Sequence, residues 1–420
     1  MIVGIIGSGG REHAICNKIS ESSKTSKIYC IPGNAGTSSI AENVDIKLDD
    51  FLSIKNFCLK NKIELLVVGP EQPLVDGIVD YFKDTNIKVF GPDKLASQLE
   101  GSKIFTKKIC KKYKIPTANF RIFEKLEDTL NFLHTSKYPT VIKADGLAAG
   151  KGVYICKNYE EGLTAAKEIF GGKFGSAKSI LIEEFLVGEE MSYFVICDGK
   201  NYQFIGTAQD HKRVGEGDKG KNTGGMGCYS PSRLFSSELA EKINLKIIKP
   251  TLKAINELGS EYKGFLYIGL MIKNTDPYLV EFNVRMGDPE CQTILPLLEN
   301  DFIEVLVSCC DGNLKKQVIK LNNKKSICIV LCAKGYPENY KNNTELKNLE
   351  NLSLKNNEYL FHAGTKFENN KIIATGGRVL NFVSLSENFR NSRDDVIKLI
   401  NDLNWDNGFF RKDIGHKVID

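Results

Sequence analysis

The sequence contains no apolar run of about 18 residues, so it predicts no transmembrane helix. Its N-terminal stretch, MIVGIIGSGGREHA, lacks the cationic segment of a signal peptide, and its apolar run breaks at Gly7. The 12 cysteines are scattered without a C-x-x-C pair, and Cys309–Cys310 is the only adjacent pair. We therefore expect a cytoplasmic protein without a membrane partner, whose thiols are reduced and buried.

An excess of charge of one sign is also absent. The formal net charge is +5 over 420 residues, and hydrophobic and charged residues make up 42% and 26% of the chain. This composition is typical of a soluble globular protein. It gives no support to a nucleic-acid partner, which needs Lys and Arg clustered on one face, whereas it suits anionic small substrates. The length predicts about two to four domains.

Strand and helix signals alternate through residues 1–100. The runs MIVGIIG, SKIYCIPG, IELLVVGP and IKVFGP are typical of strands, and the segments between them have helical periodicity. Each of these strands ends in Gly or Pro. This βαβα order predicts a doubly wound parallel sheet, which binds ligands at the carboxyl ends of its strands.

The rest of the chain predicts three further units. Residues 101–190 form a smaller mixed lobe, and residues 191–325 carry successive strands typical of an antiparallel sheet. Residues 326–420 predict a small C-terminal α/β domain that contains an exposed Asn- and Lys-rich loop. The expected fold class is α/β, with an N-terminal parallel sheet, a central two-lobed unit and this C-terminal domain.

The stretch VIKADGLAAGKGVYI, residues 141–155, carries two lysines and three glycines between apolar runs. It is not a Walker loop, because Gly146 to Gly150 is one residue too short and a strand-like VYIC follows where a helix should begin. The pattern predicts two strands joined by a mobile Gly-rich loop that can fold over a triphosphate, with Lys151 at its tip. Lys143 lies between apolar strand neighbours, where an ammonium group needs an anion. A surface hairpin with solvated lysines is the alternative.

Two later stretches favour the nucleotide interpretation. In residues 181–192, LIEEFLVGEEMS, the backbone can pair with an adenine edge while a carboxylate takes the ribose hydroxyls; an acidic turn is the alternative. In PYLVEFNVRMGDPE, the strand period places Glu281, Asn283 and Arg285 on one face. Carboxylate and amide oxygens suit Mg²⁺, and Arg285 can fork onto a phosphate or carboxylate. A solvated face with a salt bridge is the alternative there.

These residues together resemble an ATP-grasp enzyme, and the whole chain resembles the phosphoribosylamine–glycine ligases, or glycinamide ribonucleotide synthetases, of that superfamily. The resemblance runs through HAGT, ATGGRVL and RKDIG to the end, and it implies an ATP-grasp fold for the central lobes. Its motifs, in the family's order, are GSGGREHA (7–14), PGNAGT (32–37), GPEQPLVDG (69–77), KADGLAAGKGV (143–153), AQDHKR (208–213), NTGGMGCYSP (222–231) and EFNVRMGDPE (281–290).

The resemblance implies a reaction of purine biosynthesis. ATP phosphorylates the carboxylate of glycine, and the amine of 5-phosphoribosylamine attacks the glycyl phosphate to give glycinamide ribonucleotide, ADP and phosphate. ATP is then a co-substrate, and Mg²⁺ or Mn²⁺ the metal. Because the carboxylate and the γ-phosphate are both anions, positioning and charge neutralisation should dominate catalysis. We expect a monomer or a weak dimer.

The resemblance also implies site residues, carried over by motif. The catalytic residues are Lys143, Lys151 and Arg285, and the metal ligands are Glu281 and Asn283. The ATP-binding residues are Lys103, Gly146, Gly150, Gly152, Glu183, Phe185, Leu186 and Glu190. The substrate-binding residues are Gly9, Gly10 and Arg11 for the ribosyl phosphate, with Asn34, Thr37, Glu71, Asp210, Lys212, Asn222, Thr223, Gly224, Gly225, Met226, Gly227 and Asp288 around the amine and glycine.

For His13 and His211, a structural or substrate-hydrogen-bonding role is favoured over acid–base work. Departures from the family pattern fall outside the expected ligands. They are Lys219, Lys221, Cys228, Met286 and Cys291, where Thr, Pro, Ala, Phe and Thr are commoner.

Three other functions share part of this sequence pattern. A nicotinamide-dependent oxidoreductase is suggested by Gly7-Ser8-Gly9, but the dinucleotide fingerprint fails at Glu12 and lacks an acid near Ile31. A non-catalytic ATP-binding regulator would lose the metal ligands or the loop lysine, and all of these are present. Another ATP-grasp ligase with a different acid or amine is the remaining alternative.

Overall fold

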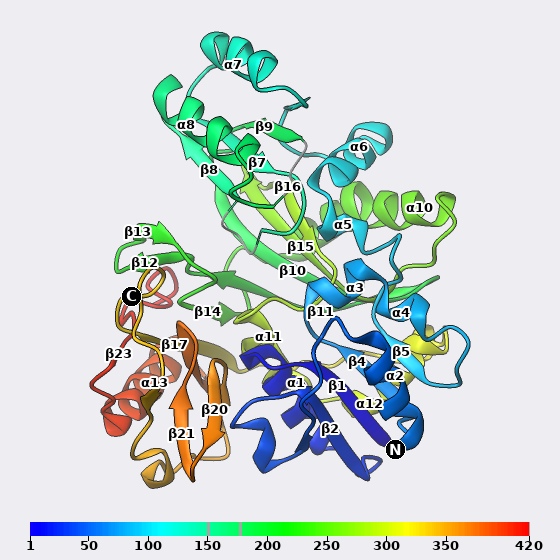
Figure 1. Cartoon of the computed structure of the whole chain (residues 1–420), viewed down its shortest axis with the longest axis vertical. Helices are drawn as coiled ribbons and strands as arrows, with labels where there is room; N and C mark the ends of the chain where they lie inside the picture. The colour runs from blue at the N-terminus through cyan, green and yellow to red at the C-terminus, as the bar shows by residue number, and fades with distance from the viewer. Residues whose placement is uncertain (149–151, 176–178, 420) are drawn as a thin grey trace.

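The structure, a computed structural model, describes residues 1–148, 152–175 and 179–419. In Figure 1 the N-terminal and C-terminal regions lie side by side at the base, a small lobe stands at the top, and the longest strands run between them. None of the described helices combines the length and the apolar character needed to cross a membrane. The expected burial of the thiols is confirmed for every cysteine except the half-buried Cys310.

The N-terminal region is the predicted parallel sheet, in the order β3-β2-β1-β4-β5. Its central strands are buried on both faces, as the unbroken apolar runs require. The single helix expected around residue 78 is instead two helices, because Gly77 takes a left-handed φ of 100°. The elements are β1 (Ile2–Gly7), α1 (Gly10–Ser20), β2 (Lys27–Pro32), η1 (Thr37–Ser39), β3 (Glu42–Asn43), α2 (Phe51–Lys60), β4 (Leu65–Val68), α3 (Glu71–Asp76), α4 (Ile78–Tyr81) and β5 (Lys88–Phe90).

The small lobe is an antiparallel sheet in the order β6-β9-β7-β8 with two helices packed against it. Lys143 pairs with Val153 across β7 and β8, which confirms a strand on each side of the Gly-rich loop. Two helices, α5 and α6, lead into this lobe from the N-terminal region. The elements are α5 (Gln98–Gly101), α6 (Lys103–Tyr113), β6 (Phe120–Phe123), α7 (Leu126–Thr135), β7 (Thr140–Ala144), β8 (Val153–Cys156), α8 (Tyr159–Phe170) and β9 (Ile180–Glu184).

The large lobe contains the expected antiparallel strands, in the order β16-β15-β10-β11-β14. The helical segment after residue 236 contains a π-helical turn, η2, which ends two residues before Pro250. The nitrogen of Pro250 carries no hydrogen and cannot donate to the preceding turn. The elements are β10 (Glu189–Asp198), β11 (Tyr202–Asp210), β12 (Arg213–Gly215), β13 (Lys219–Asn222), β14 (Gly227–Ser230), α9 (Ser237–Ile243), η2 (Asn244–Ile248), α10 (Lys249–Glu257), β15 (Lys263–Lys273), β16 (Asp276–Asn283), α11 (Glu290–Ile294), η3 (Leu295–Leu297), α12 (Phe302–Cys310) and η4 (Leu314–Lys316).

The C-terminal region continues the large-lobe sheet. Strand β17 pairs with β14, so that Gly227 lies opposite Ile329, and β22 and β19 follow beyond it. One core of buried apolar side chains joins β1, α11, α12 and β17. The elements are β17 (Lys325–Ala333), β18 (Thr344–Glu345), η5 (Leu349–Asn351), β19 (Glu358–His362), β20 (Thr365–Glu368), β21 (Lys371–Ala374), β22 (Arg378–Ser386), α13 (Phe389–Leu403) and β23 (Gly408–Phe409).

The last described residues fold back on the β12–β13 hairpin. Arg411, only 1% exposed, donates to Asp218 at 2.9 Å, to Asp413 at 2.7 and 2.8 Å, and to the carbonyl of Arg213 at 2.9 Å. Asp413 in turn accepts from the backbone N–H of Gly217 at 2.8 Å. The hairpin is therefore held from the C-terminal side by charge-assisted hydrogen bonds.

Replacing Arg411 by Ala should lower the free energy of unfolding by about 2–4 kcal/mol, since it leaves two partly buried carboxylates without their partner. Urea titration and limited proteolysis of residues 213–222 measure the effect. Lys398→Ala breaks an exposed pair with Asp402 and should change stability by at most about 0.5 kcal/mol. Equal stabilities for the two variants would contradict the role given to Arg411.

Candidate active site

Two lysines meet one buried carboxylate between α6 and the small-lobe sheet. Lys143 on β7 and Lys107 on α6 lie 2.9 and 3.0 Å from the two oxygens of Glu183 on β9, and all three side chains are at most 7% exposed. Burial by itself raises the pKa of the Glu183 carboxyl, but the two ammonium groups more than offset it and lower that pKa. The chain itself therefore supplies the anion that Lys143 needs. The side chain of Glu183, which was predicted to bind ATP, faces these two lysines.

Lys103 begins the same helix and reaches the Gly-rich loop. Its ammonium group donates to the carbonyl of Gly146 at 2.7 Å, and burial lowers its pKa. Gly146 opens the loop with a left-handed φ of 96°, and the carbonyl of Gly152 closes it by accepting from Ala144 N at 2.9 Å. The predicted residues Gly150 and Lys151 lie outside the described residues.

The segment predicted to contact adenine follows β9. Phe185 is 38% exposed, and Leu186 is half-buried. Glu190, at the start of β10, forms an ion pair with Lys212 at 2.7 Å. The Lys212 ammonium group lowers the pKa of Glu190, and Glu190 raises that of Lys212.

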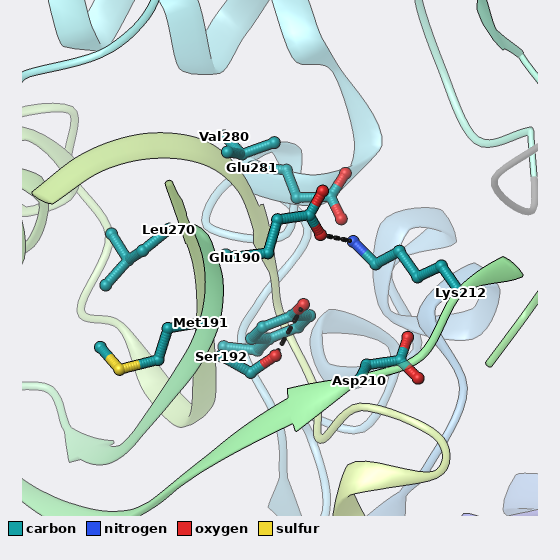
Figure 2. Close-up of a pocket in the computed structure, with 10 residues that line it drawn as sticks. Glu190, Met191, Ser192, Asp210, Lys212, Leu270, Val280 and Glu281 are labelled. Carbon is teal, nitrogen blue, oxygen red and sulfur yellow. Dashed lines mark hydrogen bonds and ion pairs between the residues drawn. The ribbon is translucent and has the colours of Figure 1, made fainter. Parts of the chain in front are cut away.

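Figure 2 shows the pocket beside this ion pair. Glu281 lies across from the Glu190–Lys212 pair, while Asp210 lies on the other side of Lys212. The Ser192 and Tyr267 hydroxyls lie 3.2 Å apart, within hydrogen-bond distance. The lining residues are Glu190, Met191, Ser192, Asp210, Lys212, Tyr267, Gly269, Leu270, Val280 and Glu281.

Two carboxyl groups share the floor of this region. Burial raises the pKa of Asp210 well above its usual range, and the nearby carboxyl of Glu290 raises it further. Burial also raises the pKa of Glu290, which accepts from Ser192 Oγ at 3.2 Å. Two carboxyls placed in this way hold protons to higher pH than isolated ones.

A β-bulge shapes the predicted metal strand. Glu281 pairs with Gly269, whereas Leu279 pairs with the next residue, Leu270, so the bulge falls at Val280. Bulges re-aim side chains next to binding sites, and here both Val280 and Glu281 line the pocket. In the described part of the chain, the Glu281 carboxylate has no ion-pair or hydrogen-bond partner. It is therefore available to a ligand.

Arg285 lies two residues beyond the end of β16 and joins two parts of the chain. Its guanidinium meets Glu71 at 3.1 Å and Glu100 at 2.8 Å, both from the N-terminal region. Arg285 lowers the pKa of Glu71 to about 2 against the effect of burial, whereas burial raises that of Glu100 to about 7. Arg285 is thus bound to carboxylates of the chain rather than left open.

The predicted phosphate loop is built on a buried glutamate. Glu12 accepts from the backbone N–H of Gly9 and from Arg11 Nε, both at 2.6 Å. A side chain at Gly10 would collide with Asn381 and Gln292, so this glycine allows α1 to approach the C-terminal region closely. Arg11 is 7% exposed and also donates to the carbonyl of Met286 at 3.2 Å. The loop brings Gly9 and Asp288 together.

Asn34 and Thr37 make their hydrogen bonds within the fold. The Asn34 amide donates to the carbonyls of Ser8 and His362 at 2.9 Å each, and its oxygen accepts from Gly36 N and Thr37 N. Thr37 is fully buried and donates to Asn43. These two side chains therefore set the shape of the loop beside the site.

The loop from Asn222 to Gly227 is fixed from the C-terminal region. Arg378, at the start of β22, donates to the carbonyls of Gly224 at 2.5 Å and Asp288 at 2.7 Å, and it lies 3.3 Å from the Asp288 carboxylate. His211, whose pKa burial lowers to about 4, accepts from Gly415 N at 3.3 Å and therefore has a structural contact.

The sequence prediction omitted Lys107, Glu100, Glu290 and Arg378. The four-residue spacing from Lys103 placed Lys107 on the same helix face, and that signal was available. Glu290 and Arg378 lie inside quoted motifs, but their partners are distant in sequence. Nothing local distinguishes Glu100.

The donor set around β16 fits a divalent cation held jointly with a nucleotide. Among the described residues there is no cluster of three or more His, Cys, Asp or Glu side chains that could hold a metal alone. Glu281 and Asn283 supply two oxygens, and Mg²⁺ commonly takes one or two protein ligands together with substrate phosphates.

Comparisons with known proteins agree with this geometry. The N domain of phosphoribosylglycinamide synthetase matches residues 1–100, its ATP-grasp (A) domain residues 101–291 and its C domain residues 326–417. The fold and the site therefore define an ATP-grasp ligase, a class that uses ATP. The chain belongs to the phosphoribosylglycinamide synthetase family, and the predicted family, fold class and ligase class are confirmed.

Similar proteins match over their whole length. The chain is 43% identical over 419 residues to the phosphoribosylamine–glycine ligase of Caldanaerobacter subterraneus subsp. tengcongensis, covering 99% of both chains. The same ligase of Haemophilus influenzae is 43% identical over 421 residues, covering 99% of this chain and 98% of that one. The crystal structure of the Thermotoga maritima ligase has a TM-score of 0.85 at 33% identity, covering 99% and 100% of the two chains.

Because Lys107 and Lys143 share Glu183, loss of the carboxylate should lower the free energy of unfolding more than loss of one lysine. Glu183→Gln leaves two buried ammonium groups without a carboxylate and should cost about 3–5 kcal/mol. Lys143→Met leaves the Lys107–Glu183 pair intact and should cost less, about 1–2 kcal/mol. Urea unfolding of both variants measures the difference, and a larger loss for Lys143→Met would contradict this account.

His13 predicts a pH effect. Its ring is 6% exposed and accepts from His362 N at 2.9 Å, and burial lowers its pKa to about 3. Because the unfolded chain takes up this proton near pH 6.5 and the folded chain does not, the stability is full above that pH and falls below it. Between about pH 7.5 and pH 5, the parent should lose about 2 kcal/mol more than His13→Asn, which keeps an acceptor. Urea titrations at the two pH values test this, and the exposed His134→Asn should behave like the parent.

Proposed function

We propose that this chain ligates glycine to 5-phosphoribosylamine at the expense of ATP, giving glycinamide ribonucleotide, ADP and phosphate. The observation that carries the proposal is the convergence of all three matched regions on one site. Arg11 and Glu71 come from the first region, Arg285 from the second and Arg378 from the third. The full-length likeness to enzymes named phosphoribosylamine–glycine ligase supports the choice of substrates.

The chemistry has two steps that balance. A carboxylate oxygen of glycine bonds to the γ-phosphorus of ATP, and the bond to ADP breaks. The phosphoribosylamine nitrogen then attacks the acyl carbon of glycyl phosphate, and the departing phosphate takes up one amine proton. Both steps bring anionic groups together or release them. Fixed cations should therefore supply much of the stabilisation of the two transition states.

The residues take the roles that their motifs predict. Lys103 and Lys143 bind the polyphosphate, together with the loop from Gly146 to Gly152, while Phe185 and Leu186 contact the adenine. Glu190 contacts the ribose. The ribosyl phosphate binds at Gly9, Gly10 and Arg11, and the amine and glycine lie near Asp210, Lys212, Asp288 and the Asn222–Gly227 loop.

The finer features belong to the same proposal. Glu281 and Asn283 hold Mg²⁺ or Mn²⁺, which neutralises phosphate charge when it is bound. The buried thiols and the composition support a cytoplasmic location, and we propose a monomer or a weak dimer.

Release of ADP tests the function directly. With Mg²⁺, ATP, glycine and freshly prepared phosphoribosylamine, ADP should form, and omission of either substrate should abolish turnover. Glu281→Gln should remain folded and lose turnover by about 100-fold or more. Faster turnover with another amino acid or another amine would instead indicate a different ATP-grasp ligase.

A further inference from the structure

Glu100 is a buried carboxylate that the reaction described above does not use. It lies in α5, where the chain passes from the N-terminal region into the ATP-grasp domain, and its side chain is 7% exposed. Val284 N donates to its Oε2 at 2.8 Å, and Arg285 Nη2 lies 2.8 Å from its Oε1. Glu100 is therefore anchored on both sides before it meets any other group.

A third donor comes from Asn283. One end of the Asn283 amide lies 3.0 Å from Glu100 Oε1 and 3.2 Å from the carbonyl of Phe282. Both of these neighbours are acceptors, so only the amide nitrogen can satisfy them, and the amide oxygen must point the other way. Without the Glu100 carboxylate a single backbone acceptor would remain to fix this orientation.

The orientation matters because the two ends of an amide differ as metal ligands. A divalent cation such as Mg²⁺ or Mn²⁺ accepts the oxygen and is repelled by the N–H₂ hydrogens. We infer that Glu100 is a positioning residue that keeps the Asn283 oxygen turned toward the nucleotide-bound metal. This inference rests on the proposed function, because it assumes the metal at Glu281 and Asn283.

Glu71 provides the matched control. It contacts the same Arg285 guanidinium at 3.1 Å, but it has no contact with Asn283 among the described residues. Both Glu71→Gln and Glu100→Gln remove one carboxylate from Arg285, but only Glu100→Gln presents an N–H₂ donor or a weaker acceptor to Asn283. A difference between the two variants is therefore due to the contacts that only Glu100 makes, with the Asn283 amide and with Val284 N.

The test is a titration of the protein with Mn²⁺ in the presence of ADP and without glycine or phosphoribosylamine. The electron paramagnetic resonance signal of free Mn²⁺ measures how much of the metal is bound. Partners that orient metal ligands commonly change metal affinity by about 10–100-fold, and Glu100→Gln should weaken Mn²⁺ binding by that factor. Glu71→Gln should bind Mn²⁺ as the parent does. Unchanged affinity in Glu100→Gln, or equal losses in both variants, would overturn the inference.

A double variant separates orientation from folding. In Glu100→Gln combined with Asn283→Asp, the new amide at 100 can donate to one carboxylate oxygen and leave the other for the metal. Glu100→Gln should therefore cost little Mn²⁺ affinity in the Asn283→Asp background, where a carboxylate oxygen faces the metal in either rotamer, whereas a purely structural role for Glu100 predicts the same loss in both backgrounds. If ADP-dependent Mn²⁺ binding follows this pattern while the ligase assay fails, the proposed substrates are wrong and the inference stands.

Discussion

The burial of Arg285 between Glu71 and Glu100 is the constraint on which the site depends. A guanidinium group is costly to remove from water, and two carboxylates from the N-terminal region offset that cost only if the end of β16 lies against that region. The ion triad therefore fixes the strand that carries Glu281 and Asn283 relative to the loop that carries Arg11. Substrates proposed for different regions can react only if this distance is held.

A similar arrangement holds the cations of the proposed nucleotide site. Lys107 and Lys143 share the single carboxylate of Glu183, and Lys103 is bound to a carbonyl, so the cluster keeps an excess of positive charge. Neutralising all of it would leave nothing to attract a triphosphate, and neutralising none would make the buried lysines deprotonate. Partial neutralisation keeps the lysines charged and held in place, as the proposed binding of a triphosphate requires.

The sequence predicted what local pattern can encode. Alternation predicted the parallel sheet of residues 1–100, and the β-branched VYIC predicted that β8 follows the Gly-rich loop. Pattern could not predict the bulge at Val280, because a bulge depends on the register with β15. The pattern also predicted that Arg285 binds a phosphate or carboxylate of a ligand. It could not identify the partners Glu71 and Glu100, because both lie more than 180 residues away in the sequence.

The continuous sheet explains why residues from the C-terminal region reach the centre of the molecule. Because β17 pairs with β14, the start of β22 lies near the loop that precedes β14, and Arg378 can bind Gly224 and Asp288 together. The last residues also hold the β12–β13 hairpin, because Arg411 donates to the carbonyl of Arg213 and Gly415 N donates to His211. The Asn222–Gly227 loop is glycine-rich and would sample many conformations by itself. Contacts from the C-terminal region therefore hold this loop, and Thr223 of the loop donates to the carbonyl of Lys212, whose side chain pairs with Glu190.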